Sequence, residues 1–243
     1  MLEWISTSRD LSDDQQNFMT ESLTQLIIQK VIKPGDVALD IGANHGLHTR
    51  HMVSSVGDSG HVHAFEPNPE LENALSKILR KNRDYLHQIA AYNVSKRLEF
   101  FVPSDDGWGT LKEELLTGKA IQGKFEVPAD RAEKYVCDED EVALIKIDVE
   151  GSELETIQGL DSIINKSHPI LIVEDFYEFK TVELLSTYGY KFLNLKGEPL
   201  DLNNRIFVNF LAVPSGNSGL DMWLNQIDLS AYFEWYFQVF RKF

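Results

Sequence analysis

Three carboxylates follow a short apolar run in the segment Leu-Ile-Lys-Ile-Asp-Val-Glu-Gly-Ser-Glu, residues 144–153. The near-continuous apolar run is typical of a strand buried on both faces, although no role is evident for the lysine within it. Asp148 and Glu150 would emerge at the carboxyl end of that strand. Glu153 lies one turn into the helix expected next, where the helix dipole stabilises a carboxylate.

A second pair of acids, Glu174 and Asp175, ends the next apolar run along the chain. Ligands of doubly wound sheets bind at the carboxyl ends of the strands, so these acids are expected to lie near Asp148. Carboxylates gathered there could act as general acids or bases, or their oxygens could hold Mg²⁺. The sequence leaves both kinds of chemistry open.

A glycine loop precedes these acids in the sequence. Residues 37–49, Val-Ala-Leu-Asp-Ile-Gly-Ala-Asn-His-Gly-Leu-His-Thr, predict a strand, a Gly-x-x-x-Gly turn and a helix. Glycines permit close approach of a ligand, and the helix N-terminus offers N–H groups to an anion. The dinucleotide fingerprint is absent because Asn44 replaces its middle glycine. Glu66 ends the following strand, a position suited to accept hydrogen bonds from a ribose diol.

Histidines recur near the glycine loop, but their spacing does not favour a metal site. His45, His48 and His51 are three residues apart, yet the first lies in the turn and no other ligand is near in sequence. His61 and His63 share one side of a strand, where a surface or packing role is expected.

The elements that must position these residues alternate along the chain, which is typical of a parallel sheet covered by helices on both faces. The predicted strands are Val37–Ile41, His61–Phe65, His87–Ala91, Val142–Ile147, Ile170–Val173, Tyr190–Leu195 and Ile206–Val213. The predicted helices are Asp13–Val31, Leu47–Val56, Glu70–Asn82, Ser152–Gln158 and Phe179–Tyr188. The last two strands have no helix between them, so they are expected to pair antiparallel.

One domain of 243 residues is predicted, with an N-terminal covering helix in 1–32, a catalytic core over 33–213 and an aromatic C-terminal helix in 214–243. The C-terminal helix either packs on the domain or provides a contact for a second copy or another domain. Residues 103–140 interrupt the alternation and are expected to carry a binding loop. Within them, Trp108 either stacks on a substrate ring or fills its own loop.

The composition narrows the function classes. Asp and Glu number 38 against 23 Lys and Arg, a net charge of −15 that disfavours a nucleic-acid partner. The single cysteine, Cys137, permits no internal disulfide and fits a reducing compartment. No apolar stretch is long enough to span a membrane and the first residues do not form a secretory signal, so a cytoplasmic location is expected.

Three ordered motifs then give a specific resemblance. Asp-Ile-Gly-Ala-Asn-x-Gly (40–46), Phe-Glu-Pro-Asn-Pro (65–69) and Ile-Lys-Ile-Asp-Val-Glu-Gly-x-Glu (145–153) resemble the FkbM family of S-adenosylmethionine-dependent methyltransferases. The resemblance covers residues 33–175. It implies a class I methyltransferase fold, a Rossmann-like sheet of seven mostly parallel strands with the last one antiparallel, in agreement with the strands counted above.

The resemblance also implies cofactor contacts. Carried over by position, those on the methionine side are Asp40, Gly42, Asn44 and Gly46, with His48 or Thr49 at the carboxylate and Asp148 at the ammonium. Glu66 would bind the ribose and Ala91 or its neighbours the adenine. Asp148, Glu174 and Asp175 are similar in position to the Mg²⁺ ligands of some O-methyltransferases.

We therefore expect O-methylation of a hydroxyl on a sugar, glycan or other small metabolite, because the acids could supply the base that such a nucleophile needs. Asp148, Glu150 and Glu174 are the candidate catalytic residues, and Trp108 and Glu150 the candidate substrate contacts. One alternative is N-methylation of a protein side chain. Another is a cofactor-binding interaction module without catalysis.

Overall fold

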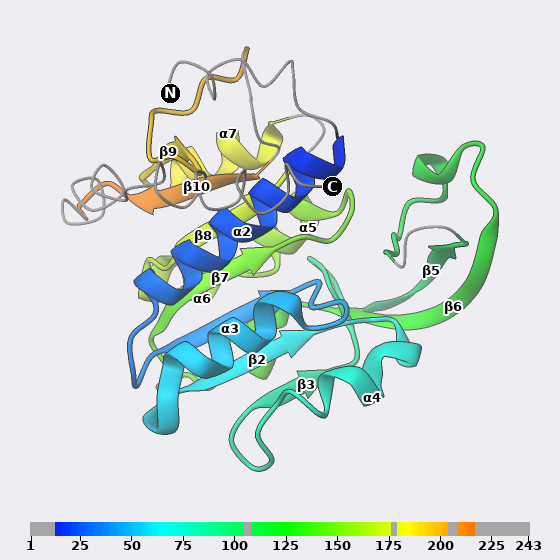
Figure 1. The fold of residues 1–243 in the computed structure, drawn as a ribbon, viewed down its shortest axis with the longest axis horizontal. Helices are drawn as coiled ribbons and strands as arrows, with labels where there is room; N and C mark the ends of the chain where they lie inside the picture. Colours follow the sequence, from blue (N-terminus) through cyan, green and yellow to red (C-terminus); the bar gives the residue numbers. More distant parts are fainter. Residues whose placement is uncertain (1–12, 105–107, 176–178, 204–208, 217–243) are drawn as a thin grey trace, which may run out of the picture.

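A seven-stranded sheet forms the centre of the fold in the computed structural model, which describes residues 13–104, 108–175, 179–203 and 209–216 (Figure 1). Its strand order is β3-β2-β1-β7-β8-β10-β9. These strands are β1 (Val37–Ile41), β2 (His61–Phe65), β3 (Tyr85–His87), β7 (Val142–Ile147), β8 (Ile170–Glu174), β9 (Tyr190–Asn194) and β10 (Asn209–Pro214).

The pairing of these strands confirms the predicted sheet. Strands β3, β2, β1, β7 and β8 run parallel, whereas β10 is antiparallel to both β8 and β9. The carboxyl ends of β1, β2 and β7 therefore meet at one edge of the sheet. Part of the predicted last strand, residues 206–208, lies outside the described residues.

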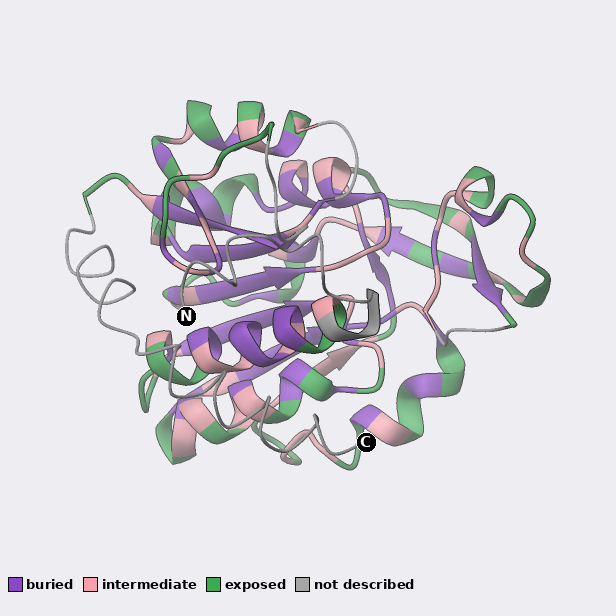
Figure 2. Cartoon of the chain, turned by 45° about the horizontal axis from the view of Figure 1, so that its top comes forward, coloured by how far each residue is buried: buried purple, intermediate pink, exposed green. Residues whose placement is uncertain are grey.

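Helices cover both faces of the sheet, and the strands between them are buried (Figures 1 and 2). Helices α2 (Asp13–Val31) and α3 (Leu47–Val56) pack on one face through side chains such as Leu23 and Met52. Helices α5 (Glu153–Gln158), α6 (Asp161–Ser167) and α7 (Lys180–Thr187) cover the other. Burial of each large apolar side chain stabilises the fold by about 1.5–3 kcal/mol.

Two predicted elements differ from the structure. The helix expected over residues 70–82 is reduced to a 3₁₀ turn, η3 (Pro69–Leu71), and one helical turn, α4 (Glu72–Leu75). Arg80 accounts for the change, because its guanidinium donates to Asp84 and to two backbone carbonyls and so fixes a turn structure. The strand expected over residues 87–91 is divided, since β3 ends at residue 87 and β4 (Ala90–Ala91) joins another sheet.

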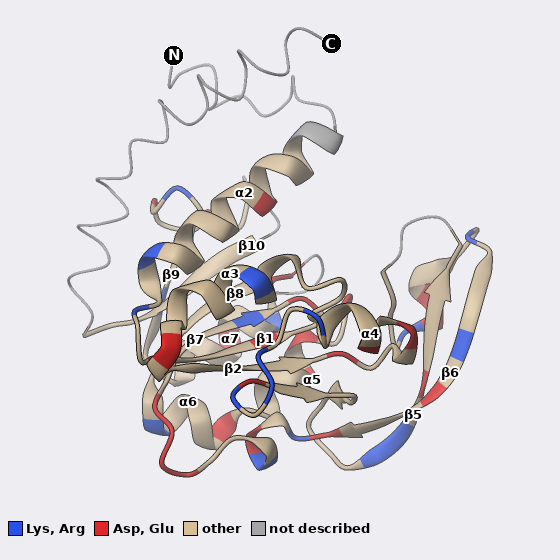
Figure 3. Cartoon of the chain, turned by 60° about the horizontal axis from the view of Figure 1, so that its bottom comes forward, with Lys and Arg blue, Asp and Glu red and all other residues tan. Residues whose placement is uncertain are grey.

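That second sheet was not predicted. It has the order β4-β6-β5 and contains β5 (Lys96–Pro103) and β6 (Ile121–Asp130), an antiparallel pair that extends away from the main sheet (Figure 1). Alternate side chains of these strands form a small apolar cluster, in which Phe100 and Val127 are buried. Exposed ion pairs such as Lys124 with Glu99, 2.7 Å apart, cross the pair of strands, where Figure 3 shows charged segments of both signs.

Short 3₁₀ turns complete the described structure: η2 (Gly57–Ser59), η4 (Glu113–Leu116) and η5 (Ala132–Tyr135). No helix within the described ranges is long and apolar enough to cross a membrane. The predicted aromatic C-terminal helix falls largely in residues 217–243, which lie outside the described residues, so its packing or contact role stays a prediction.

Candidate active site

A cleft lies at the carboxyl edge of β1, β2 and β7 and has about 630 Å³ of empty space, part of it open to solvent. Several residues predicted for cofactor or substrate line it together. They are Gly42, Asn44, Glu66, Ala91, Trp108, Asp148 and Glu150. The glycine loop and Trp108, which are distant in sequence, thus lie at one cleft. Ligands of such sheets are expected to bind there, where the parallel strands end.

The glycine loop is packed tightly against the end of β7. Gly42 has φ +80°, and a Cβ there would lie 1.7 Å from the carbonyl oxygen of Asp148. Its N–H donates to the carbonyl of Phe65 at 3.0 Å, which joins the loop to the end of β2. Only glycine fits this position, and the loop is thereby fixed beside Asp148.

Glu66 holds the two sides of the cleft together. Its side chain is 5% exposed and accepts the backbone N–H of Asn44 at 2.7 Å and that of Asn68 at 2.9 Å. Burial raises the pKa of Glu66 to about 7, against the lowering effect of these two hydrogen bonds. The carboxyl thus organises the loop directly, and its predicted role toward a ribose stays a prediction.

Four other predicted cofactor residues lie behind the glycine loop rather than in the cleft. Asp40 is fully buried and accepts a hydrogen bond from the hydroxyl of Thr49 at 2.5 Å. His48 Nε2 lies 2.7 Å from Glu21 Oε2 of helix α2. Gly46, with φ +80°, is the N-cap of α3 and faces apolar side chains of residues 75 and 78. These contacts stabilise the glycine loop from outside the cleft.

Lys146, for which the sequence suggested no role, lies buried beneath the acids. Its Nζ donates to Asp148 Oδ2 at 2.7 Å. Burial by itself would lower the pKa of Lys146, but the charges of Asp148, Asp40 and Glu174 raise it above its ordinary value. A permanently charged ammonium therefore compensates the carboxylates at the end of the sheet.

Glu150 occupies an unusual position at the mouth of the cleft. Its φ is +51°, a conformation rare for residues other than glycine, and Thr110 Oγ1 donates to its carbonyl at 2.7 Å. Burial, followed by the negative charges of Asp148 and Glu153, raises the pKa of the Glu150 carboxyl well above its usual range. The carboxyl is poised to exchange a proton near neutral pH.

Glu153 is a buried acid and Glu174 a half-buried one, and neither lines the cleft. Burial and the charge of Asp148 raise the pKa of Glu174. Glu153 is 4% exposed and accepts the N–H of Gly151 at 2.8 Å, while burial raises its pKa to about 7. Glu153 therefore fixes the turn that presents Glu150, a contact that the expectation of a dipole effect alone did not include.

The acids predicted to hold Mg²⁺ do not gather into a site. Asp175 accepts a hydrogen bond from Thr181 Oγ1 at 2.5 Å, and one Asp148 oxygen is bound to Lys146. In the described part of the chain, Asp148, Glu174 and Asp175 do not place three ligand oxygens within 4.8 Å of one another. A lysine ammonium occupies the place of a cation here, so these residues do not fit Mg²⁺.

Two polar atoms of the cleft region are buried without a hydrogen-bond partner among the described residues: Asn44 Oδ1 and Ser152 Oγ. Such atoms are costly unless a ligand or water satisfies them. An acceptor amide oxygen, a hydroxyl and the acids Glu66 and Asp148 match a ligand that carries an ammonium and a ribose diol. The residues present therefore fit S-adenosylmethionine.

The comparison with protein families identifies the fold that carries this cleft. Residues 40–192, more than half of the chain, match the Methyltransferase FkbM domain. The chain belongs to the FkbM methyltransferase family. A comparison with curated proteins found no match.

A solved structure of an FkbM methyltransferase supports the same fold. The FkbM methyltransferase from Methylobacillus flagellatus is 16% identical with a TM-score of 0.50, and the match covers 84% of this chain and 56% of that one. The present chain thus spans little more than half the length of that FkbM relative. A putative rRNA methylase from Clostridium thermocellum is 15% identical over 79% of this chain and 93% of that one, with a TM-score of 0.49. Aeropyrum pernix fibrillarin, solved with bound S-adenosyl-L-methionine, is 14% identical over 79% and 74%, also with a TM-score of 0.49.

Proposed function

We propose that this FkbM-family chain transfers a methyl group from S-adenosylmethionine to a hydroxyl oxygen of a sugar, glycan or other small metabolite. The observation that carries the proposal is the composition of one cleft. Gly42, Glu66 and Asp148 line it beside Glu150, a half-buried acid with a raised pKa, and the aromatic ring of Trp108. A cofactor-binding wall and a proton acceptor therefore share one space.

The cofactor wall binds through its acceptors. When bound, S-adenosylmethionine supplies an electrophilic methyl group attached to a sulfonium. Glu66 accepts hydrogen bonds from the ribose, and Asn44 Oδ1 and Asp148 accept them from the ammonium. Because Lys146 and the glycine loop fix Asp148 in place, this carboxylate needs little further ordering when the ligand binds.

Glu150 removes the proton of the acceptor hydroxyl. An aliphatic hydroxyl is a poor nucleophile at neutral pH, and a base with a pKa near the working pH improves it most. The raised pKa of Glu150 meets that condition, whereas Asp148 is already bonded to Lys146. Glu150 thus takes the proton as its carboxylate and releases it to solvent after the transfer.

The test incubates the protein with S-adenosylmethionine that carries a labelled methyl group and with panels of sugars, phenols, amines and peptides. The incorporation of label into each acceptor is then measured. Incorporation into hydroxyl acceptors is expected. Glu150→Gln removes the base but keeps the shape, so kcat should fall by roughly 100-fold or more. The matched control is Glu183→Gln on the exposed face of α7, which should keep wild-type kcat.

Other outcomes point to other functions. Incorporation into amines or peptide amides and not into hydroxyls would replace the O-methylation proposal with N-methylation. Cofactor binding without transfer to any acceptor class would favour an interaction module. An unchanged kcat in Glu150→Gln would remove Glu150 from the role of base.

A further inference from the structure

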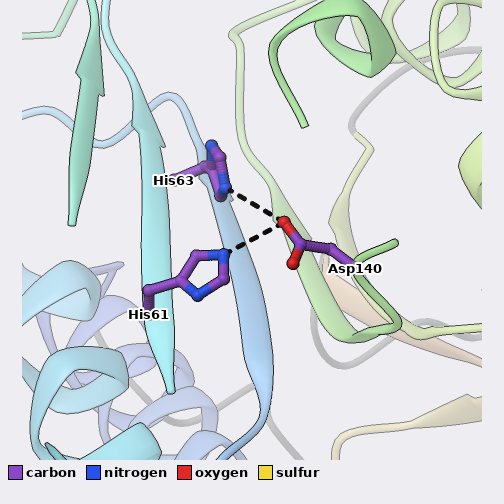
Figure 4. Close-up of side chains that lie close together, drawn as sticks. All are labelled: His61, His63 and Asp140. Atoms are coloured by element: carbon purple, nitrogen blue, oxygen red, sulfur yellow. Dashed lines mark hydrogen bonds and ion pairs between the residues drawn. The ribbon is translucent and has the colours of Figure 1, made fainter. Parts of the chain in front are cut away.

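The side chains of two histidines and an aspartate lie close together beside the main sheet (Figure 4). His61 and His63 lie on β2, near its amino end, and Asp140 lies in the loop that precedes β7. Among the residues that the structure describes, only this set offers three potential ligand atoms from His, Cys, Asp or Glu within 4.8 Å of one another. The sequence pattern suggested only a surface or packing role for both histidines.

The spacing of the three ligand atoms fits a small metal ion. His61 Nε2 lies 3.1 Å and His63 Nε2 4.0 Å from the same oxygen, Asp140 Oδ2. Bond lengths of about 2.0–2.2 Å around a tetrahedral Zn²⁺ correspond to ligand atoms roughly 3.3 Å apart. Small side-chain rotations therefore suffice to place all three atoms around one ion.

His63 Nε2 is the atom most in need of a partner. The side chain is 2% exposed, and Nε2 is buried without a hydrogen bond while it points toward Asp140. A buried imidazole nitrogen of this kind is satisfied by a metal ion.

The other nitrogen of the same ring is already oriented. His63 Nδ1 lies 3.0 Å from His87 Nε2, and the two rings stack 5.2 Å apart. Histidine ligands commonly donate their second ring N–H to such a neighbouring group, which fixes the tautomer that ligates. His87 thus serves as the orienting partner of the proposed ligand.

The loop that carries Asp140 is also fixed. The backbone N–H of Asp140 donates to the carbonyl of Cys137 at 3.0 Å. Lys166 Nζ donates to the carbonyl of Asp140 at 2.8 Å and also to the carbonyl of Asp138. The side chains of His61 and Asp140 remain 22% and 19% exposed. An ion can therefore enter from solvent and keep a water molecule as its fourth ligand.

We propose that His61, His63 and Asp140 bind one Zn²⁺ ion or a similar divalent transition metal. Imidazole nitrogens select such metals over Mg²⁺ and Ca²⁺, which prefer oxygen ligands. The ion joins β2 to the loop before β7 and stabilises the amino edge of the sheet. None of these three residues lines the cleft, and the site does not depend on methyl transfer.

The test titrates EDTA-treated and desalted protein with Zn²⁺ by calorimetry and measures retained metal by mass spectrometry. One ion per chain is expected, with a higher melting temperature on binding. Asp140→Asn, in a partly exposed loop, and His61→Gln should each weaken binding by roughly tenfold or more. His87→Phe keeps the ring stack but loses the nitrogen, and should weaken binding by about tenfold.

The control is Cys137→Ser, because an exposed thiol three residues from Asp140 is the competing explanation for zinc uptake. This variant should bind like the wild type, and circular dichroism verifies that every variant is folded. Failure of the folded wild type to retain Zn²⁺ would overturn the proposal. Equal affinity in Asp140→Asn and His61→Gln, or loss of binding in Cys137→Ser alone, would also overturn it.

Discussion

The role of Lys146 could not be predicted from the sequence. A lysine in an apolar strand is unexpected because its burial is costly without partners. The partners are Asp148, whose Oδ2 accepts from Nζ at 2.7 Å, and the charge of Asp40 on strand β1. Motif positions predicted each of these acids, but only the fold brings them around one ammonium. The contact with Lys146 also occupies one oxygen of Asp148, one of the three acids predicted to hold Mg²⁺.

Stability should depend on pH through the buried acids. The pKa values of Glu66 and Glu153 are raised to about 7 by burial, and that of Glu174 is raised as well. The folded state therefore keeps protons that the unfolded state loses above about pH 4.5, so this stability is lost as pH rises. The lowered pKa values of His63 and His87, also caused by burial, reduce stability only as pH falls below about 6.5.

Above pH 6.5 the acids alone should decide the slope, and the free energy of unfolding should fall from pH 6.5 to 9. Glu174→Gln should reduce the steepness of this slope by the equivalent of at most one bound proton, which is about 1.4 kcal/mol per pH unit. Urea unfolding at several pH values measures it, with the exposed Glu183→Gln as control. A slope identical in Glu174→Gln and wild type would show that Glu174 does not hold its proton.

At the scale of elements, the sheet was predictable and the insertion was not. Nearly continuous apolar runs at β1, β7 and β8 stand out because both faces of those strands are covered. Strands β5 and β6 are half exposed, and their charged alternate residues resemble a loop, although the spacing of Leu98, Phe100 and Val102 was an available signal. The helix predicted over residues 70–82 does not form over its whole length, because the hydrogen bonds of Arg80 outweigh the apolar periodicity of the segment.

The β5–β6 segment supplies Trp108, which lines the cleft and lies under Lys119 Nζ at 4.9 Å from the ring centre. Stacking on a substrate ring contributes about 0.5–1.5 kcal/mol, so Trp108→Ala should raise the KM for the acceptor roughly threefold to tenfold. The affinity for S-adenosylhomocysteine should stay constant. Trp108→Phe, which keeps an aromatic face, is the matched control and should retain most of the wild-type KM. An acceptor KM unchanged in Trp108→Ala would mean that the ring only fills its own loop.

At the scale of the whole molecule, one sheet presents two different chemistries at its two edges. The carboxyl edge gathers acids and the glycine loop around the cleft, and the amino edge gathers the histidines and Asp140. Ordered motifs made the first edge predictable, because they mark where parallel strands end. The second edge depends on His61 and His63 together with Asp140, which lies 79 residues after His61 in the sequence, and no motif links them.

The most direct test of the account is a calorimetric titration of the folded chain with S-adenosylhomocysteine, the product form of the cofactor. One molecule per chain should bind, and Glu66→Gln and Asp148→Asn should each weaken binding by roughly tenfold or more, about 1.4 kcal/mol. Glu183→Gln should bind like the wild type. Absence of binding to the folded wild-type chain would contradict the proposal that this cleft holds S-adenosylmethionine.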